Sequence, residues 1–290
     1  MEITNHAGLP QAIVEAVTND PYPHGRVGDI TATSLIDAPR IRVLKRRHAH
    51  ELVEDASERI WALLGQAVHT ILERAEPSAV TERRLFAEVE GWQVSGQFDR
   101  AVLYPDSGLL QDYKVTSAWA VVNGIKPEWV RQLNVLRWLA LRNGYDVERL
   151  QVVAILRDWS RGKAAQGDGY PQQQVAVIEV PVWPEAQTEA YVRERVRLHQ
   201  AAELAPEPPP CSAEERWQRS TTYAVMRRGR KSAIRVLEDP EAAAQRAERE
   251  GGYVEERPGR AVRCEQYCPV RDFCQQAAGA AAAAEPAEVA

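Results

Sequence analysis

Two short stretches of the sequence place acidic and basic side chains where they could act together on a phosphate. They are Gly96-Gln97-Phe98-Asp99 and Leu110-Gln111-Asp112-Tyr113-Lys114-Val115. Asp112 and Lys114 lie two residues apart on an expected strand, so their side chains project from the same face. Carboxylate oxygens bind Mg²⁺ or Mn²⁺, and a divalent cation held in this way polarises a phosphate and activates water for attack. The compact ammonium of Lys114 could orient that water and offset charge in the transition state.

The turn Pro105-Asp106-Ser107-Gly108 decides whether Asp99 joins this pair. If those four residues are the loop of a hairpin, Asp99 lies opposite Lys114. Any loop of even length keeps Asp99 on the face that carries Asp112 and Lys114, whereas an odd loop would turn it away. A D-x-K triplet alone is common, and a solvated ion pair on an edge strand is the alternative interpretation.

A helix upstream supplies a further candidate ligand. Apolar residues recur every three or four positions over residues 51–76, which predicts a helix that ends at Pro77. His69 and Glu73 lie one turn apart on one face of this helix. An imidazole ligand would favour Mn²⁺ somewhat over Mg²⁺. The alternative is a packed or surface histidine with no ligand role.

The order of these residues is G-x-x-x-H on a helix, then G-x-x-D, then D-x-K, then a helix that carries a glutamine. This order resembles the RecB-like nucleases of the PD-(D/E)XK superfamily, and among them the CRISPR-associated RecB-like exonucleases and their phage-encoded relatives. The resemblance implies an α/β, restriction-endonuclease-like core with a mixed sheet flanked by helices.

The resemblance also implies roles for individual residues. The implied metal ligands are His69, Asp99, Asp112 and the backbone carbonyl of Tyr113. Lys114 takes the place of the catalytic lysine, and Gln132 that of the glutamine in the Q-x-x-x-Y motif, which supports the active site and DNA. The family often has Glu where this chain has Asp112, and the tyrosine of the motif is replaced by Leu136.

All four cysteines follow the helix-breaking stretch at 205–210. Cys264, Cys268 and Cys274 form a compact trio, and Cys211 stands alone before it. Zinc usually takes paired C-x₂₋₄-C units, whereas a [4Fe–4S] cluster tolerates this distribution, and Pro269 directly after Cys268 echoes ferredoxins. The iron–sulfur members of the nuclease family are similar, although their first gap usually has two residues. We therefore predict a [4Fe–4S] cluster that acts as a structural clasp, with Zn²⁺ or uncoordinated thiols as the alternatives.

Two basic clusters could follow a phosphate backbone, and a solvated surface is the alternative for each. The first lies within residues 40–47. The second comprises Arg227, Arg228, Arg230, Lys231 and Arg235, with no acidic residue between 226 and 236. Among the aromatic residues Trp92, Trp119 and Tyr223, which could stack on unpaired bases, Trp119 is the best candidate because it follows Lys114 by five residues.

The chain has 290 residues, with 36 Lys+Arg against 41 Asp+Glu and a net charge of −5. We expect a helical, basic lead-in over 1–57, a nuclease core over 58–200, a Pro-rich linker over 201–210, a four-cysteine iron–sulfur segment over 211–275 and a disordered Ala-rich tail over 276–290. Strands are expected within 83–115 and at 149–157 and 173–182, and helices at 127–143 and 184–203.

Several classes of protein are disfavoured by what the sequence lacks. No apolar run approaches the ~20 residues of a membrane span, and the N-terminus has no secretory signal pattern. Four cysteines are too few for a disulfide scaffold, which favours a reducing cytoplasm. The family resemblance implies the cytoplasm of a prokaryotic or phage-infected cell. No G-x-x-x-x-G-K-[ST] motif is present, so a helicase motor is not expected within the chain.

These observations predict a metal-dependent DNA nuclease that hydrolyses phosphodiester bonds. By resemblance, it is a single-stranded DNA exonuclease in recombination, repair or CRISPR-like or phage DNA processing, with a helicase or integrase-type protein as a possible partner. The alternative from another class is a non-catalytic nucleic-acid-binding adaptor that uses the same fold. The complete set of His69, Asp99, Asp112 and Lys114 argues for the enzyme.

Overall fold

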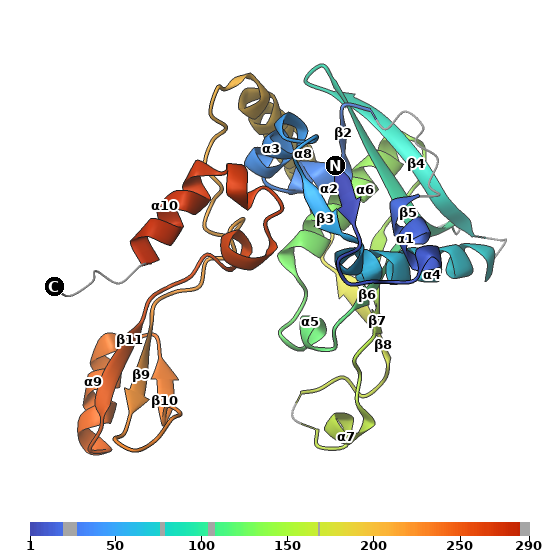
Figure 1. Cartoon of the computed structure of the whole chain (residues 1–290). Helices are drawn as coiled ribbons and strands as arrows, with labels where there is room; N and C mark the ends of the chain where they lie inside the picture. The colour runs from blue at the N-terminus through green and yellow to red at the C-terminus, as the bar shows by residue number, and fades with distance from the viewer. Residues whose placement is uncertain (20–27, 76–78, 104–107, 168, 285–290) are drawn as a thin grey trace. The chain divides into compact units, whose positions relative to one another are not determined.

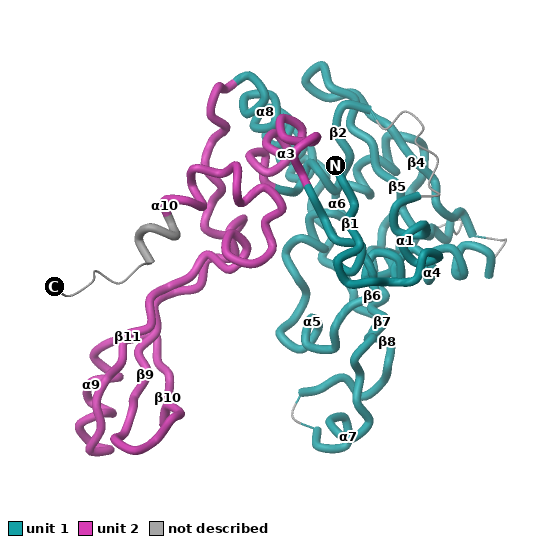
Figure 2. The backbone as a smooth tube through the Cα atoms, in the orientation of Figure 1, with its two compact units in different colours: residues 1–37, 53–204 teal, residues 38–52, 205–290 magenta. Residues whose placement is uncertain are grey.

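The larger of two units in the computed structural model of this protein contains a long β-hairpin at one edge of its sheet (Figure 1). The structure describes residues 1–19, 28–75, 79–103, 108–167 and 169–284. Unit 1 comprises residues 1–37 and 53–204, and unit 2 comprises 38–52 and 205–290 (Figure 2). The predicted lead-in over 1–57 is therefore divided between the two units.

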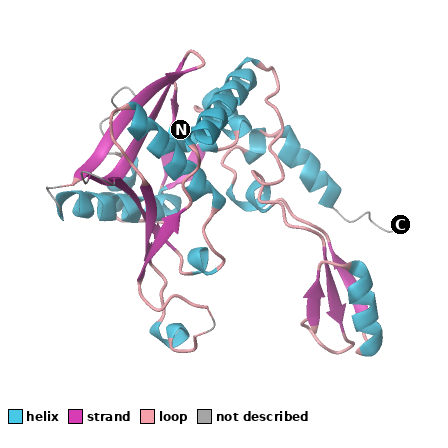
Figure 3. Cartoon of the chain, turned by 180° about the vertical axis from the view of Figure 1, so that it is seen from behind, coloured by secondary structure: helices cyan, strands magenta, loops and turns pink. Residues whose placement is uncertain are grey.

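Unit 1 is a mixed α/β unit with helices on both sides of a sheet (Figure 3). Its elements are β1 (Glu2–Thr4), α1 (Gln11–Thr18), β2 (Ile30–Thr31), α2 (Ala32–Ile36), β3 (Val53–Asp55), α4 (Ile60–Ala75), β4 (Val80–Val89), β5 (Trp92–Leu103), β6 (Gly108–Thr116), α5 (Trp119–Val122), α6 (Pro127–Arg142), β7 (Arg149–Leu156), α7 (Arg161–Ala164), β8 (Val175–Val180) and α8 (Glu185–Leu204). The prediction of a mixed sheet flanked by helices is confirmed. Residues 76–78, which contain Pro77, lie outside the described residues.

The hairpin of β4 and β5 is closed by the two-residue turn Glu90-Gly91. Both residues have a positive φ, 50° and 75°, as the turn that matches the twist of two antiparallel strands requires. Val89 pairs with Trp92, and the same register continues to Val80, which pairs with Ala101. The turn therefore fixes which residues of β4 lie beside the G-x-x-D stretch of β5.

The strand order β2-β5-β6-β7-β8, with β4 on β5, leaves part of one edge of β5 unpaired. β4 follows one edge, while the other edge pairs with β2 at Val94 and Ser95 and with β6 from Arg100 onwards. Among the described residues, no strand pairs with 96–99 on that second edge. β6 instead runs parallel to β7 as far as Thr116. The strands β5 and β6 thus diverge at the G-x-x-D stretch.

The expected register between β5 and β6 is wrong by two residues. Leu103 pairs with Gly108, so Asp99 is level with Asp112 and not with Lys114. Gly108 belongs to the strand because the Asp146 carbonyl approaches it so closely that a Cβ there would lie 1.8 Å from that oxygen. A shift of two preserves the face, and Asp99 stays on the side of Asp112. The remaining residues of the predicted turn, 105–107, lie outside the described residues.

Helix α6 packs against the sheet at Gly96. A Cβ at this position would lie 2.5 Å from a Leu136 methyl and 2.7 Å from one of Leu139, so the glycine allows this approach without displacing either leucine side chain. The core around α6 consists of fully buried apolar side chains, among them Phe98, Leu110, Leu133, Leu136, Trp138, Leu139 and Leu150. The glycine of the G-x-x-D motif is therefore a packing residue that sets the position of β5.

Unit 2 contains helix α3 (Pro39–Arg47), a small ββαβ module and a C-terminal helix. The module comprises β9 (Thr222–Met226), β10 (Arg235–Leu237), α9 (Pro240–Arg249) and β11 (Tyr253–Arg257), with strand order β10-β9-β11. Helix α10 (Gln275–Ala284) occupies the start of the segment that was expected to be a disordered tail, and 285–290 lie outside the described residues. Among the described residues, no helix is long and apolar enough to cross a membrane.

Candidate metal site and four-cysteine cavity

The divergence of β5 and β6 creates a place where side chains from three elements meet. The Asp99 carboxylate accepts a hydrogen bond of 2.6 Å from the backbone N–H of Tyr113. The Tyr113 carbonyl in turn lies 3.2 Å from Nε2 of His69 on α4. Nδ1 of the same imidazole lies 3.5 Å from Asp99. The structure thus brings together three of the predicted ligands, His69, Asp99 and the Tyr113 carbonyl.

Glu82 on β4 completes this cluster, and the sequence analysis missed it. Its carboxylate lies 3.5 Å from Nδ1 of His69, and the ligand atoms of Glu82, His69 and Asp99 lie within 4.8 Å of one another. Gln97, inside the G-x-x-D stretch, donates a hydrogen bond to Glu82 and accepts one from Arg84. The signal was available, because the register fixed by the Glu90-Gly91 turn places Glu82 opposite Asp99.

The backbone of Glu82 is unusual for a residue that is not glycine. Its φ is +47°, in the left-handed region, and it interrupts a ladder whose neighbours Thr81 and Arg83 remain paired. Such a conformation costs roughly 1–2 kcal/mol and is most often kept where a side chain must be aimed. In this conformation the Glu82 carboxylate lies beside Nδ1 of His69.

Asp112 and Lys114 form an ion pair beside this cluster. The Lys114 ammonium lies 2.6 Å from the Asp112 carboxylate, and the Asp112 side chain is almost fully buried. Asp112 lies outside the trio of Glu82, His69 and Asp99. The predicted face-sharing of Asp112 and Lys114 is therefore seen as a direct contact that fixes the position of the ammonium.

The cluster is electrostatically crowded, and its residues fit a divalent cation. Burial, together with the nearby Asp112 carboxylate, raises the pKa of Asp99 to about 7. Contact with Glu82 raises the pKa of His69 above its ordinary value. The shift of Asp99 comes first from desolvation of its carboxyl group and then from repulsion by Asp112, whereas that of His69 comes from attraction to the neighbouring carboxylates. A Mg²⁺ or Mn²⁺ ion bound by these oxygens and the imidazole would relieve that repulsion.

Replacing Glu82 with glutamine is expected to weaken Mn²⁺ binding by ~10-fold or more, because a charged oxygen of the cluster is removed while its shape is kept. The measurement is a Mn²⁺ titration followed by EPR of the free ion. The matched control is Glu88→Gln, which removes the same charge from an exposed position on the same strand. Equal Mn²⁺ affinities of the two variants would exclude Glu82 from the site.

The other predicted site residues of unit 1 are not part of the cluster formed by His69, Glu82 and Asp99. Gln132 is half-buried on α6, and within the described part of the chain it forms no hydrogen bond that joins it to the cluster. The Trp119 ring is 55% exposed and rests edge-on against Tyr170, with the Lys163 ammonium 5.2 Å from its centre. Trp92 is partly buried against the core. Trp119 is thus open to a stacking partner, and Trp92 is a packing residue.

The four cysteines of unit 2 line one small cavity. Its wall includes Cys211, Cys264, Cys268 and Cys274, together with Ile41, Val270 and Ala277. Within the described chain, no three of these sulfurs lie within 4.8 Å of one another. Sulfurs bound to a single zinc ion at 2.3 Å would be about 3.8 Å apart. The four thiols thus line one cavity of about 10 Å³, without the close approach of three sulfurs that a bound zinc ion would require.

Cationic groups also line this cavity. Arg40 on α3 and Arg216 are part of its wall, as is Arg263. The Arg216 Nε–H is buried and has no hydrogen-bond partner among the described residues, which costs about 1–3 kcal/mol unless an acceptor is supplied. Burial raises the pKa of Cys211 to about 12 and also raises those of Cys264 and Cys268. The wall also includes Glu215, so the cavity combines four thiols with three guanidinium groups and one carboxylate.

The two basic clusters have different surroundings. In the first cluster Arg40 is buried and Arg47 donates hydrogen bonds to the Pro206 and Ala205 carbonyls, so these two side chains have partners within unit 2. The second cluster lies on the β9–β10 hairpin, and its members are exposed: Arg227, Arg228, Arg230, Lys231 and Arg235. Tyr223 packs in the small core beneath α9 and is not free to stack on a base.

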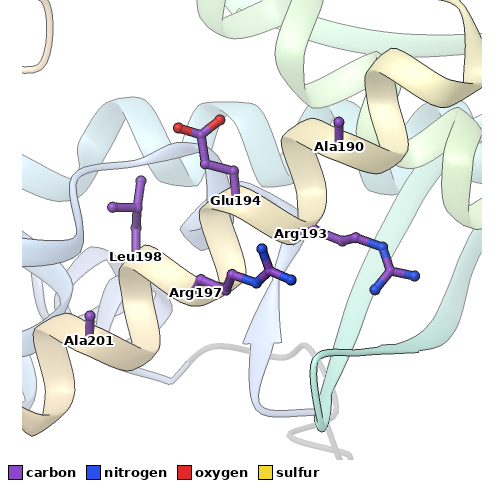
Figure 4. Close-up of a pocket in the computed structure, with 6 residues that line it drawn as sticks. All are labelled: Ala190, Arg193, Glu194, Arg197, Leu198 and Ala201. Atoms are coloured by element: carbon purple, nitrogen blue, oxygen red, sulfur yellow. The ribbon is translucent and has the colours of Figure 1, made fainter.

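A shallow hollow on α8 is lined by Ala190, Arg193, Glu194, Arg197, Leu198 and Ala201 (Figure 4). Arg193 lies 2.7 Å from Glu90, and Arg197 lies 3.1 Å from the same carboxylate. The charges of this hollow are therefore neutralised within unit 1, and its side chains offer no additional chemistry.

Solved structures that resemble this chain include exonucleases. The crystal structure of SSO0001 matches with a TM-score of 0.44 and 16% identity, over 64% of this chain and 82% of that one. The alkaline exonuclease LHK-Exo of Laribacter hongkongensis matches with a TM-score of 0.37 and 17% identity, over 61% and 90%. LHK-Exo in complex with dAMP gives 0.35 and 17%, over 59% and 88%. No family model and no curated protein matches the chain.

Proposed function

We propose that the protein is a divalent-metal-dependent nuclease that hydrolyses phosphodiester bonds in DNA. The observation that carries this proposal is the meeting of His69, Glu82 and Asp99 at the divergence of β5 and β6, directly beside the Asp112–Lys114 ion pair. Buried acidic groups around an imidazole suit a metal, and an adjacent ammonium suits the phosphate that the metal would bind.

Each side chain has a distinct task in this proposal. The groups that would hold Mg²⁺ or Mn²⁺ are His69, Glu82, Asp99 and the Tyr113 carbonyl. Asp112, near the point where β5 and β6 diverge, would be a further ligand. When bound, the metal polarises the phosphate and promotes ionisation of water. Asp112 holds the Lys114 ammonium 2.6 Å away, where it can offset negative charge on the phosphate and orient the attacking water.

We further propose that the substrate is single-stranded DNA attacked from an end. Trp119 supports this proposal because its exposed ring and the neighbouring Lys163 ammonium offer stacking and phosphate contact together. Lys114 lies on β6, which ends at Thr116. Trp119 begins α5 three residues later. A role in recombination, repair or CRISPR-like or phage DNA processing, with a helicase or integrase-type partner, belongs to the same proposal.

End-labelled single-stranded DNA, incubated with Mn²⁺ and with the full-length protein, tests this function. Mononucleotide release from the start of the reaction would support an exonuclease, whereas internal fragments would indicate an endonuclease. A parallel reaction with labelled RNA separates DNA from RNA preference. Binding of DNA without any cleavage would instead favour the non-catalytic adaptor.

The β9–β10 hairpin is proposed as a DNA-binding element. The double substitution Arg228→Ala and Arg230→Ala is expected to weaken single-stranded DNA binding, and to lower the slope of log Kd against log salt by about 0.7 for each phosphate that the variant no longer neutralises. Fluorescence anisotropy across a salt series measures both. Lys45→Ala with Arg74→Ala removes the same charge from exposed positions elsewhere. A slope equal to that of this control would show that the hairpin does not bind DNA.

We also propose that the four cysteines hold a [4Fe–4S] cluster. Two features support it: four thiols around one cavity, and the buried Arg216 N–H that lacks an acceptor among the described residues. The cluster would join α3, the segment at Cys211 and the C-terminal trio into one structural clasp. Iron and sulfide analysis, with absorbance near ~400 nm, distinguishes it from a colourless zinc site.

A further inference from the structure

Arg40 is an unusual arginine because it is buried against a cysteine sulfur. Its side chain is almost fully buried, and its Nε donates a hydrogen bond of 3.1 Å to Sγ of Cys274. The rest of the guanidinium donates to the Pro208 carbonyl and to the Glu207 carboxylate. Three separate groups therefore fix its orientation, so that one N–H points at the sulfur.

Arg216 offers a second buried N–H on the wall of the same cavity. Its Nε has no acceptor among the residues that the structure describes, although the guanidinium is part of the cavity wall. Cys264 lies close enough to Arg216 to be influenced by its charge. Arg216 thus brings to the cavity wall a buried Nε–H that lacks an acceptor among the described residues, and a group bound in the cavity would supply that acceptor.

We propose that Arg40 and Arg216 are positioning residues for the iron–sulfur cluster, which they hold through N–H···S hydrogen bonds and by offsetting its negative charge. This inference rests on the cluster proposed above. A [4Fe–4S] core with four thiolate ligands is anionic, and its reduction adds a further negative charge. Hydrogen bonds to sulfur and nearby cations therefore favour the reduced state and retention of the cluster.

The position of Arg40 in the chain makes this role specific. It lies on α3, in the segment 38–52, whereas all four cysteines lie beyond residue 210. Ile41 and Leu44 of α3 pack in one core with Val270 and Cys274. An N-terminal helix thus supplies both apolar cover and a cation to a C-terminal cysteine site, and the site is incomplete without it.

The test uses the full-length protein with its cluster, in four forms: wild type, Arg40→Gln, Arg40→Lys and Lys45→Gln. Lys45 is an exposed residue on the same helix, so Lys45→Gln is a matched control for the removed charge. Iron content, the midpoint potential in a dye-mediated titration and the rate of iron release to a chelator are measured for each.

Arg40→Gln is expected to have a more negative midpoint potential and to release iron ~10-fold or more faster than wild type. Arg40→Lys, which keeps the charge, should recover part of both properties, and Lys45→Gln should match wild type. If Arg40→Gln behaves as Lys45→Gln does, or if Arg40→Lys recovers nothing, the proposal is wrong. Absence of iron from the wild type would instead refute the cluster itself.

A second variant covers the case in which Arg40→Gln does not fold, as judged by circular dichroism. Arg216→Met removes an N–H that has no partner within the described chain, so the substitution breaks no internal hydrogen bond of that atom. Its midpoint potential is also expected to become more negative, with faster iron release. If Arg40→Gln is unfolded, and Arg216→Met has the same midpoint potential and rate of iron release as Lys45→Gln, the proposal is wrong.

Discussion

Replacing Lys114 with alanine is expected to lower kcat for DNA cleavage by about 10²- to 10³-fold, the usual effect of removing one electrostatic stabiliser of a transition state. Lys114 has the only ammonium paired with the buried Asp112 carboxylate among the described residues, at 2.6 Å. Initial rates at saturating Mn²⁺ and DNA measure the effect. DNA affinity should change far less, because one ammonium adds little to total phosphate attraction.

The control for this experiment is Lys45→Ala, which removes an exposed lysine of α3. It should retain the wild-type rate. Asp99→Ala should be as inactive as Lys114→Ala, because the ligand cluster is then incomplete. A Lys114→Ala protein that cleaves as fast as Lys45→Ala would refute both the role of Lys114 and the proposed site.

Replacing Cys264 with alanine is expected to abolish iron binding and to destabilise unit 2 by several kcal/mol. The physical reason is that the binding free energy of a structural metal group becomes folding free energy when only the folded state can hold it. The core beside the cysteines is small, with Ile41, Leu44 and Val270 as its largest apolar side chains. Besides the cluster, α3 is joined to the C-terminal segment by this small core and by the hydrogen bonds of Arg40 and Arg47, so loss of the cluster weakens the attachment without removing it.

Limited proteolysis with mass spectrometry measures this second effect, because cleavage should become much faster within residues 38–52 and 205–275. Ser220→Ala, at an exposed position of the same unit, is the control and should remain protected. Iron content near the wild-type level in Cys264→Ala would show that Cys264 is not a ligand. An iron-free protein with unchanged protection would show that the cluster is not a clasp.

Local patterns in the sequence determined the elements and part of the site. Alternating residues and the Glu90-Gly91 turn predict strands, and spacing by two places Asp112 and Lys114 on one face. Both follow from backbone geometry within a few residues, and the two side chains share a face as predicted. The ion pair itself belonged to the alternative interpretation, in which it was solvated, whereas Asp112 is buried. The grouping of all four cysteines in one segment was likewise readable from their order, and they line one cavity.

Tertiary structure decided which separate segments meet. The register of β5 and β6 depends on the packing of Gly108 against Asp146, which lies far along the chain, so Asp99 is level with Asp112. Glu82 joins His69 only because its backbone takes a left-handed conformation at the unpaired position opposite Asp99. Arg40 reaches Cys274 because α3 packs in unit 2. Residue types and local spacing determine what a segment can do, whereas contacts between distant segments depend on packing free energy summed over the whole fold.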